Sequence, residues 1–272
     1  MGADPTAEQS RLALGLYAAY REIRDGLPVA GKFMPYRWRN LPNPLGAIWM
    51  AYSQMLDEFS SELANIVNDL TNHVHRLQAW ARVVANLSDD EKMEATHEFI
   101  DVLATNAVNL PYVIRSRFAF ASAHLCHQAN MAKNLTDWKD DLPLDGEIWL
   151  NTTDQYGRGW RRYTRFKRRV EAIGASQYKE STLDFRNAYN HRFSPKFVIG
   201  MTDLVSRHVN ETTGQICYGF GGRDPFDLDK IADLLATERE RCYSAFEAFQ
   251  ILVREHESAI TAFEEAEKAA RS

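Results

Sequence analysis

Residues 45–84, LGAIWMAYSQMLDEFSSELANIVNDLTNHVHRLQAWARVV, decide the fold of this chain. Apolar side chains recur along this stretch at steps of three and four residues. They are Ile48, Trp49, Tyr52, Leu56, Phe59, Leu63, Ile66, Leu70, Val74, Leu77, Ala81 and Val84. This period matches one face of an α-helix, and it continues for about forty residues. The stretch therefore predicts one very long amphipathic helix.

A second long helix is predicted at the other end of the sequence. Pro225 and Asp227 are typical of a helix start, and the apolar positions that follow keep heptad-like steps through Phe263. Shorter helices are predicted over residues 6–26, from the capping-box pattern at residues 88–91 onward, and from Pro111 onward. Helical periodicity thus covers most of the chain.

The predicted fold class is all-α, an elongated antiparallel helical bundle with two very long helices. Two β-rich pieces near residues 204–220, separated by a polar loop at residues 210–214, add one small β-hairpin to this expectation. The sequence shows no internal repeat and no second polar linker. We therefore expect one helical domain over residues 1–272, with an N-terminal helix and a Pro-rich connector in residues 1–44 and the bundle in residues 45–272.

Composition and charge argue against several classes of function. The chain carries 37 acidic and 32 basic residues, and its formal net charge of −5 gives no global attraction to nucleic acid or anionic lipid. Its three cysteines, Cys126, Cys217 and Cys242, lack the spacing of a disulfide framework or a zinc knuckle, so neither a metal nor another cofactor is predicted. No signal-peptide pattern and no membrane-spanning apolar run is visible. We expect a cytoplasmic protein without a membrane partner.

Arginines gather in one short segment, residues 158–170. Six of them recur at helical steps: Arg158, Arg161, Arg162, Arg165, Arg168 and Arg169. Aromatic and aliphatic residues recur on the opposite side at Trp160, Tyr163, Phe166 and Val170, which predicts one continuous arginine face above a buried face. Guanidinium groups suit RNA phosphates, so these arginines are the predicted nucleic-acid-binding residues. The alternative is a solvated face neutralised by the acidic loop at residues 135–157, in which residues 148–150 are expected to be extended.

Three potential metal ligands, His124, Cys126 and His127, lie close together in the sequence. They fall in a predicted helix among apolar neighbours, and they lack a companion cluster at ligand spacing. A structural role in the core or at the surface is therefore preferred, and no metal ligand is predicted.

A second candidate site is the stretch Phe185-Arg186-Asn187-Ala188-Tyr189-Asn190-His191-Arg192, which Pro195 follows closely. An arginine and a histidine at such spacing arise about twice by chance in this composition, and the chain has two, Arg186/His191 and Arg117/His124. Five helical steps turn the chain by about 500°, so on a continuous helix Arg186 and His191 would lie roughly 140° apart. We therefore expect the helix to end between them, with Asn190 as the left-handed residue.

The neighbourhood of Arg186 distinguishes it from Arg117, because Asn187 follows directly and the segment reads Arg-Asn-x-x-x-His. This motif resembles the HEPN superfamily, the α-helical bundle domains of bacterial toxins, antiphage systems and RNA-processing factors. The run of residues 184–192 is most similar to an uncharacterised bacterial branch of that family. The resemblance implies a metal-independent endoribonuclease in a defence or toxin-antitoxin setting. It also implies a symmetric homodimer and an antitoxin or nucleotidyltransferase partner.

One position departs from the family pattern. Toxins of the family that are silenced by nucleotide transfer carry a tyrosine two positions after the histidine, whereas this chain has Phe193 there and a tyrosine inside the motif, at Tyr189. Regulation by tyrosine modification at that site is therefore not expected.

The residue types of the motif suit RNA cleavage on chemical grounds. Arg186 would stabilise the developing phosphate charge, His191 would move protons, and Asn187 would orient either partner. The alternative is a helix terminus in which Arg186 pairs with Asp184 or Glu180, Asn187 caps and His191 covers the last carbonyls. For the whole protein, the alternative to the enzyme is a non-catalytic helical module that binds RNA or a protein partner.

Overall fold

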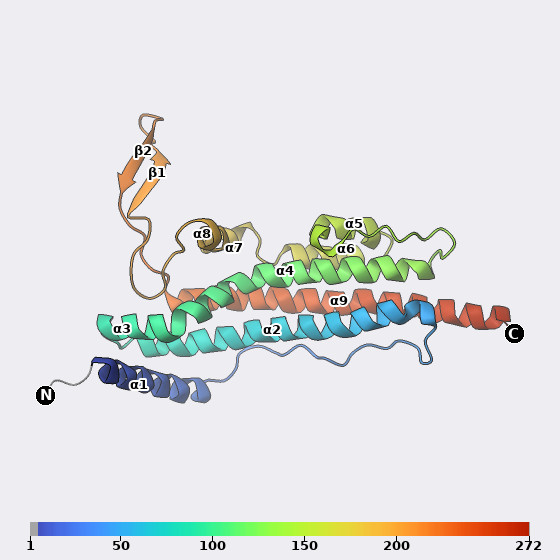
Figure 1. Cartoon of the computed structure of the whole chain (residues 1–272), viewed down its shortest axis with the longest axis horizontal. Coiled ribbons are helices and arrows are strands. Elements are labelled where there is room, and N and C mark those ends of the chain that lie inside the picture. Colours follow the sequence, from blue (N-terminus) through green and yellow to red (C-terminus); the bar gives the residue numbers. More distant parts are fainter. Residues whose placement is uncertain (1–4, 272) are drawn as a thin grey trace. The chain divides into compact units, whose positions relative to one another are not determined.

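The computed structural model describes residues 5–271, which are mostly helical with one small antiparallel sheet (Figure 1). The helices are α1 (Pro5–Gly26), α2 (Met50–Val84), α3 (Asp89–Ala95), α4 (Asp101–Ala129), α5 (Leu150–Gly157), α6 (Tyr163–Glu171), α7 (Ser176–Ser181), α8 (Phe185–His191) and α9 (Leu228–Arg271). The strands are β1 (Val205–Val209) and β2 (Ile216–Phe220). Short 3-10 turns lie at Ala47–Trp49, Asn130–Ala132 and Asp145–Glu147, and a π-helical turn lies at Thr96–Ile100. The predictions of a mainly helical chain and of a hairpin near residues 204–220 are confirmed.

The chain groups into two compact units, each assembled from three segments. Unit 1 comprises Met1–Gly31, Leu70–Asn109 and Ser176–Thr237, and unit 2 comprises Lys32–Asp69, Leu110–Ala175 and Glu238–Ser272. The helices α2, α4 and α9, which are 35, 29 and 44 residues long, contribute residues to both units. The single domain over residues 1–272 stays a prediction.

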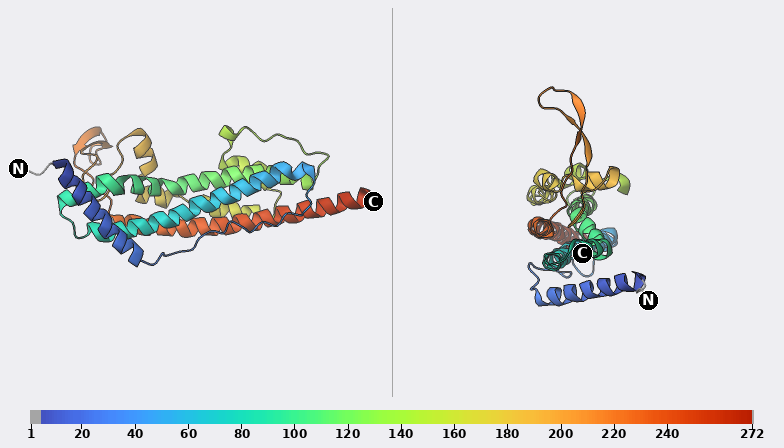
Figure 2. Two further views of the ribbon diagram at one scale, coloured as in Figure 1. Left: turned by 60° about the horizontal axis from the view of Figure 1, so that its bottom comes forward. Right: turned by 90° about the vertical axis from the view of Figure 1, so that its left-hand side faces the viewer.

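Unit 1 has two aromatic clusters. In the first, the ring of Trp80 stacks on Tyr20 at 4.5 Å and on Phe99 at 5.2 Å, which joins α1, α2 and the π-helical turn. In the second, Phe185 at the start of α8 packs against Phe197 at 5.5 Å. Such rings bury large apolar areas, and they anchor the short helices of this unit. The hairpin β1–β2 stands clear of the helices of its own unit (Figures 1 and 2).

Unit 2 is built around Phe118 of α4, which contacts Phe166 of α6 at 6.1 Å and Phe249 of α9 at 5.9 Å. The Pro-rich connector before α2 is attached to this core, because Trp38 lies edge-on to Phe249 at 6.0 Å. Tyr36 of the connector donates a hydrogen bond to Asn65 at 2.9 Å. A segment without regular structure is thus fixed by aromatic packing.

Of two helix starts predicted from the sequence, the one at Ser88 is confirmed and the one at Pro111 is wrong. Ser88 caps α3 in the reciprocal manner expected, since its hydroxyl accepts the N–H of Glu91 while the Glu91 carboxylate accepts the N–H of Ser88. The predicted start at Pro111 is wrong, because this residue lies inside α4. A proline there removes one helical N–H, and near this point Tyr178 donates its hydroxyl proton to the Val108 carbonyl at 2.7 Å. Burial of Pro111 favours a continuous helix, because tertiary packing offsets the loss of one helical N–H.

The acidic loop also differs from expectation. Residues 148–150 do not form an extended piece, because α5 begins at Leu150 and only Ile148 and Trp149 have extended backbone. The side chain of Thr152 accepts the N–H of Trp149 at 3.1 Å and so helps to start α5. A three-residue apolar run is too short for its pattern to separate a strand from a helix start.

Candidate functional site

The buried side of the arginine-rich segment is as predicted. Trp160, Tyr163, Phe166 and Val170 are all buried. The Phe166 ring packs on Phe118 and also on Phe249, at 5.9 Å. A nine-residue helix is too short to be stable alone, so this packing holds α6 in place.

The six arginines are all exposed, but they do not form one continuous helical face. Helix α6 begins at Tyr163, so Arg158, Arg161 and Arg162 precede it in a turn, and that part of the prediction is wrong. The turn follows from close packing, because a Cβ atom added at Gly157 would lie 2.3 Å from the Tyr163 ring. Only a glycine allows α5 to end against that ring.

The start of α6 is stabilised by an acidic side chain of α9. The Glu255 carboxylate accepts the backbone N–H of Arg161 at 3.0 Å and that of Arg162 at 2.9 Å. These donors lack intrahelical partners at a helix N-terminus, and a negative charge is favoured there. Glu255 also lies 3.6 Å from the Arg161 guanidinium.

The remaining arginines differ in how they are paired. Arg158 lies 3.8 Å from Asp154. Within residues 5–271, the side chains of Arg162, Arg165, Arg168 and Arg169 have no hydrogen-bond or ion-pair partner. Asp154 belongs to the acidic loop of residues 135–157, so this loop pairs with one of the six arginines. The other loop carboxylates with described ion pairs lie beside His124 and His127. Among the described contacts, the loop therefore does not neutralise the arginine face as a whole.

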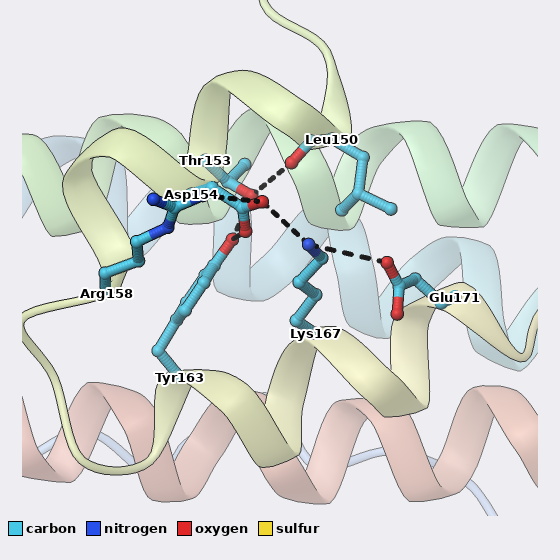
Figure 3. A network of polar contacts seen from close by, with 7 residues as sticks. All are labelled: Leu150, Thr153, Asp154, Arg158, Tyr163, Lys167 and Glu171. Carbon is cyan, nitrogen blue, oxygen red and sulfur yellow. Dashed lines mark hydrogen bonds and ion pairs between the residues drawn. The ribbon is translucent and has the colours of Figure 1, made fainter.

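A polar network that includes Arg158 joins α5 to α6 (Figure 3). The Asp154 carboxylate accepts hydrogen bonds from Tyr163 at 2.8 Å and from Lys167 at 2.7 Å. Lys167 also lies 3.6 Å from Glu171, and the Tyr163 hydroxyl contacts that of Thr153. Lys167, the one lysine among the arginines, is thus paired with carboxylates of the protein. The network fixes the rotation of α6 and hence the outward direction of its arginines.

The charges of this network stabilise one another. Burial raises the pKa of Asp154, but the hydrogen bonds from Lys167 and Tyr163 outweigh burial, so the pKa is lowered overall. The hydrogen bond to Asp154 is the main reason that the pKa of Lys167 is raised. Both groups therefore stay charged at neutral pH, and the network persists there.

The predicted catalytic residues Arg186, Asn187 and His191 are all exposed on α8. The expected helix end between Arg186 and His191 is wrong, because the N–H of Arg192 still bonds to the Ala188 carbonyl at 2.8 Å. The left-handed residues lie before the helix, at Leu183 and Asp184, each with φ of 52°. On this continuous helix Arg186 and His191 point in directions that differ by about 140°, so the structure does not bring them together within one chain.

The surroundings of α8 are mixed in charge. Asn187 donates to the Asp184 carboxylate at 3.1 Å, and Asp184 lies 3.5 Å from Lys179. The side chain of His191 has no hydrogen-bond partner among residues 5–271, so it does not cover the last carbonyls of the helix. Tyr189 borders two surface hollows that also contain Lys196.

The structure contains a buried polar cluster around His256 that was not predicted from the sequence. The His256 ring lies 3.6 Å from the Cys126 sulfur, 3.2 Å from the Tyr52 hydroxyl, and 4.3 Å from the centre of the Trp160 ring. Burial lowers the pKa of His256 to about 3 and raises the pKa of Cys126 well above its usual range. A neutral thiol without access to solvent is a poor nucleophile, so this cluster supports Trp160 structurally. In the sequence, His256 falls on the apolar stripe of α9 between Val253 and Ile260. This position could have predicted that the histidine is buried.

No group of three or more metal-binding side chains is found within the described residues 5–271. None of the helices in that range combines the length and apolar character of a membrane span. Comparison with protein-family models, curated proteins and solved structures finds no match to this chain.

Proposed function

We propose that the protein is a cytoplasmic helical module that binds RNA through the arginines of residues 158–169. The proposal rests on four exposed guanidinium groups that have no partner within residues 5–271 and that lie on a firmly anchored segment, namely Arg162, Arg165, Arg168 and Arg169. Unpaired arginines side by side repel one another, and a row of phosphates relieves that repulsion.

The charge of the whole chain makes this local site selective. A net charge of −5 opposes nonspecific attraction of RNA to the rest of the surface. Each guanidinium can donate two parallel hydrogen bonds to a phosphate, and it stays charged at every physiological pH. The affinity should therefore depend strongly on salt, because phosphate contacts release counterions.

Fluorescence anisotropy with a labelled single-stranded RNA tests the proposal. The variant Arg165→Ala/Arg168→Ala/Arg169→Ala should weaken binding by about 30-fold or more and reduce the slope of log K against log salt by about 2 to 3. The matched control is Arg11→Ala/Arg21→Ala/Arg37→Ala, which removes the same charge from three exposed arginines elsewhere. Equal losses in the two variants, or no binding by the unaltered protein, would refute RNA binding at this site.

A second candidate is the metal-independent endoribonuclease of HEPN type, with Arg186, Asn187 and His191 as its catalytic residues and no cofactor. It is favoured by the exposure of all three side chains on one short helix beside hollows that contain Arg192 and Lys196. The ribose 2′-oxygen would bond to phosphorus as the bond to the 5′-oxygen breaks. His191 would accept the 2′-proton and Arg186 would stabilise the phosphate charge.

This second candidate requires a homodimer. One copy cannot direct both groups to one phosphate, so a second copy must supply either the arginine or the histidine. The family resemblance adds a defence or toxin-antitoxin setting and an antitoxin or nucleotidyltransferase partner to this candidate. The apolar periodicity of the sequence and its lack of a second polar linker add a single-domain elongated antiparallel bundle with two very long helices.

Complementation in excess EDTA tests the enzyme. Arg186→Ala and His191→Ala should each abolish cleavage of labelled RNA, while a mixture of the two variants should regain part of the activity. A mixed dimer regains one complete site when the two residues come from different copies. Absence of cleavage by the unaltered protein, or full activity in either variant, would eliminate this candidate and leave RNA binding untouched.

A further inference from the structure

The hairpin β1–β2 exposes an apolar face that its own unit leaves uncovered. The register pairs Val205 with Phe220, Arg207 with Tyr218 and Val209 with Ile216, so these six side chains share one face. The exposed fractions of the apolar members are Val205 52%, Val209 57%, Ile216 63%, Tyr218 69% and Phe220 89%. An isolated two-stranded hairpin is marginally stable in water, so a partner that covers this face or extends the sheet would stabilise the hairpin.

The hydrogen-bond pattern shows which backbone groups are free. Gly221 donates to the Leu204 carbonyl at 3.0 Å, and Asn210 donates to the Gln215 carbonyl at 2.8 Å. Because antiparallel pairs alternate along the strands, Cys217 and Gly219 also direct their backbone groups toward β1. The N–H and C=O groups of Ile216, Tyr218 and Phe220 therefore point away from β1, at the outer edge of β2.

The two edges of the hairpin differ in protection. Arg207 lies in the middle of β1, and pairing this edge with its own copy would place two arginines directly opposite each other. The β2 strand, Ile-Cys-Tyr-Gly-Phe, contains neither a charged residue nor a proline. Charges and prolines are the usual protection of an exposed edge, so β2 is open to pairing and β1 is not.

We propose that β2 pairs with the β2 strand of a second copy of this chain, antiparallel and centred on Tyr218. In this register Ile216 faces Phe220 of the second copy and Tyr218 faces its own counterpart, so all five residues of the strand are paired. The free N–H and C=O groups at these three positions are then satisfied, and both apolar faces join into one face of a four-stranded sheet. This inference does not rest on RNA binding.

Sedimentation of the full chain over a range of concentrations tests this interface. Tyr218→Pro removes an outward N–H without breaking the β1–β2 ladder, and it should weaken dimerisation at least about tenfold. Arg207→Pro is the matched control, because it removes an outward N–H from the β1 edge, and its dimerisation should stay within about twofold of the unaltered protein. A protein that remains monomeric, or a dimer indifferent to Tyr218→Pro, would overturn the proposal.

Cross-linking keeps the test valid if proline disturbs the hairpin. In a Cys217→Ser background, Tyr218→Cys should form a disulfide-linked dimer under mild oxidation, because opposed residues at the two-fold axis have Cα atoms about 5.5 Å apart. Arg207→Cys in the same background should not. Cys126 and Cys242 are buried and do not interfere. Equal cross-linking of the two variants would refute the register.

Discussion

Helices α6 and α8 both carry exposed arginine side chains, but they differ in the packing and hydrogen bonds that hold each helix in place. Helix α6 has three buried residues on its inner side and a polar network that fixes its rotation. Three of its arginine side chains have no partner in the described part of the chain. Helix α8 spans seven residues, and its functional candidates point in different directions around the axis. A cluster of charges becomes a binding surface only where the backbone beneath aligns the side chains.

The largest effect concerns the aromatic base of α6. Phe166→Ala should lower the free energy of unfolding by about 3–5 kcal/mol, because it leaves a cavity among Phe118 and Phe249. Phe193→Ala, at the 84% exposed residue that follows α8, should change it by less than about 0.5 kcal/mol. Denaturant unfolding measures both. Similar losses of unfolding free energy in the two variants would show that the buried side of α6 does not contribute more to stability than the exposed residue after α8.

Folding stability should fall at acid pH because of His256, the buried histidine that packs on Trp160. The pKa of His256 is lowered from 6.5 to about 3 in the folded protein, so the unfolded chain binds a proton first as the pH falls below 6.5. Folding stability is therefore complete above that pH, and this group removes up to about 1.4 kcal/mol per pH unit below it.

His256→Gln should flatten the dependence of stability on pH between about 6.5 and 4, measured by denaturant unfolding at several pH values. Tyr52→Phe is the control, because it removes a hydrogen bond to His256 but keeps the imidazole, so its slope should match that of the unaltered protein. An unchanged slope in His256→Gln would contradict this assignment.

A charge-preserving substitution separates the guanidinium shape from its charge. Arg165→Lys/Arg168→Lys/Arg169→Lys should reduce RNA affinity by about 3- to 10-fold with little change in the salt slope, because lysine keeps the charge but loses the planar fork. Lysine at Arg11, Arg21 and Arg37 should have no effect. An affinity equal to that of the unaltered protein would indicate charge attraction alone.

The smallest effect concerns the turn before α8. Leu183 has a positive φ of 52°, a conformation that costs a leucine about 1–2 kcal/mol and an asparagine less. Leu183→Asn should therefore raise the free energy of unfolding by about 0.5 kcal/mol, and Leu135→Asn, at another exposed leucine, should not raise it. Thermal unfolding of both variants measures the difference. Destabilisation by Leu183→Asn would indicate that the leucine side chain is needed for packing.

Much of the local structure was predictable because it follows from short-range chemistry. The apolar period of residues 45–84 located α2, and the reciprocal side chains of Ser88 and Glu91 placed the start of α3. The two β-rich pieces separated by a polar loop near residues 204–220 predicted the hairpin. The buried residues of α6 were also correct. Each of these features depends on residues within a few positions of one another, so the sequence alone determined them.

Other features depend on residues that are distant in the sequence, and the tertiary structure decided them. The helix continues through Pro111 because this residue is buried and tertiary packing offsets the loss of one helical N–H. Glu255 places the start of α6 and so removes three arginines from the helix. The direction of Arg186 relative to His191 depends on where α8 ends, and a few hydrogen bonds decide that point. Spacing names the residues of a site, but packing and hydrogen bonding set their directions.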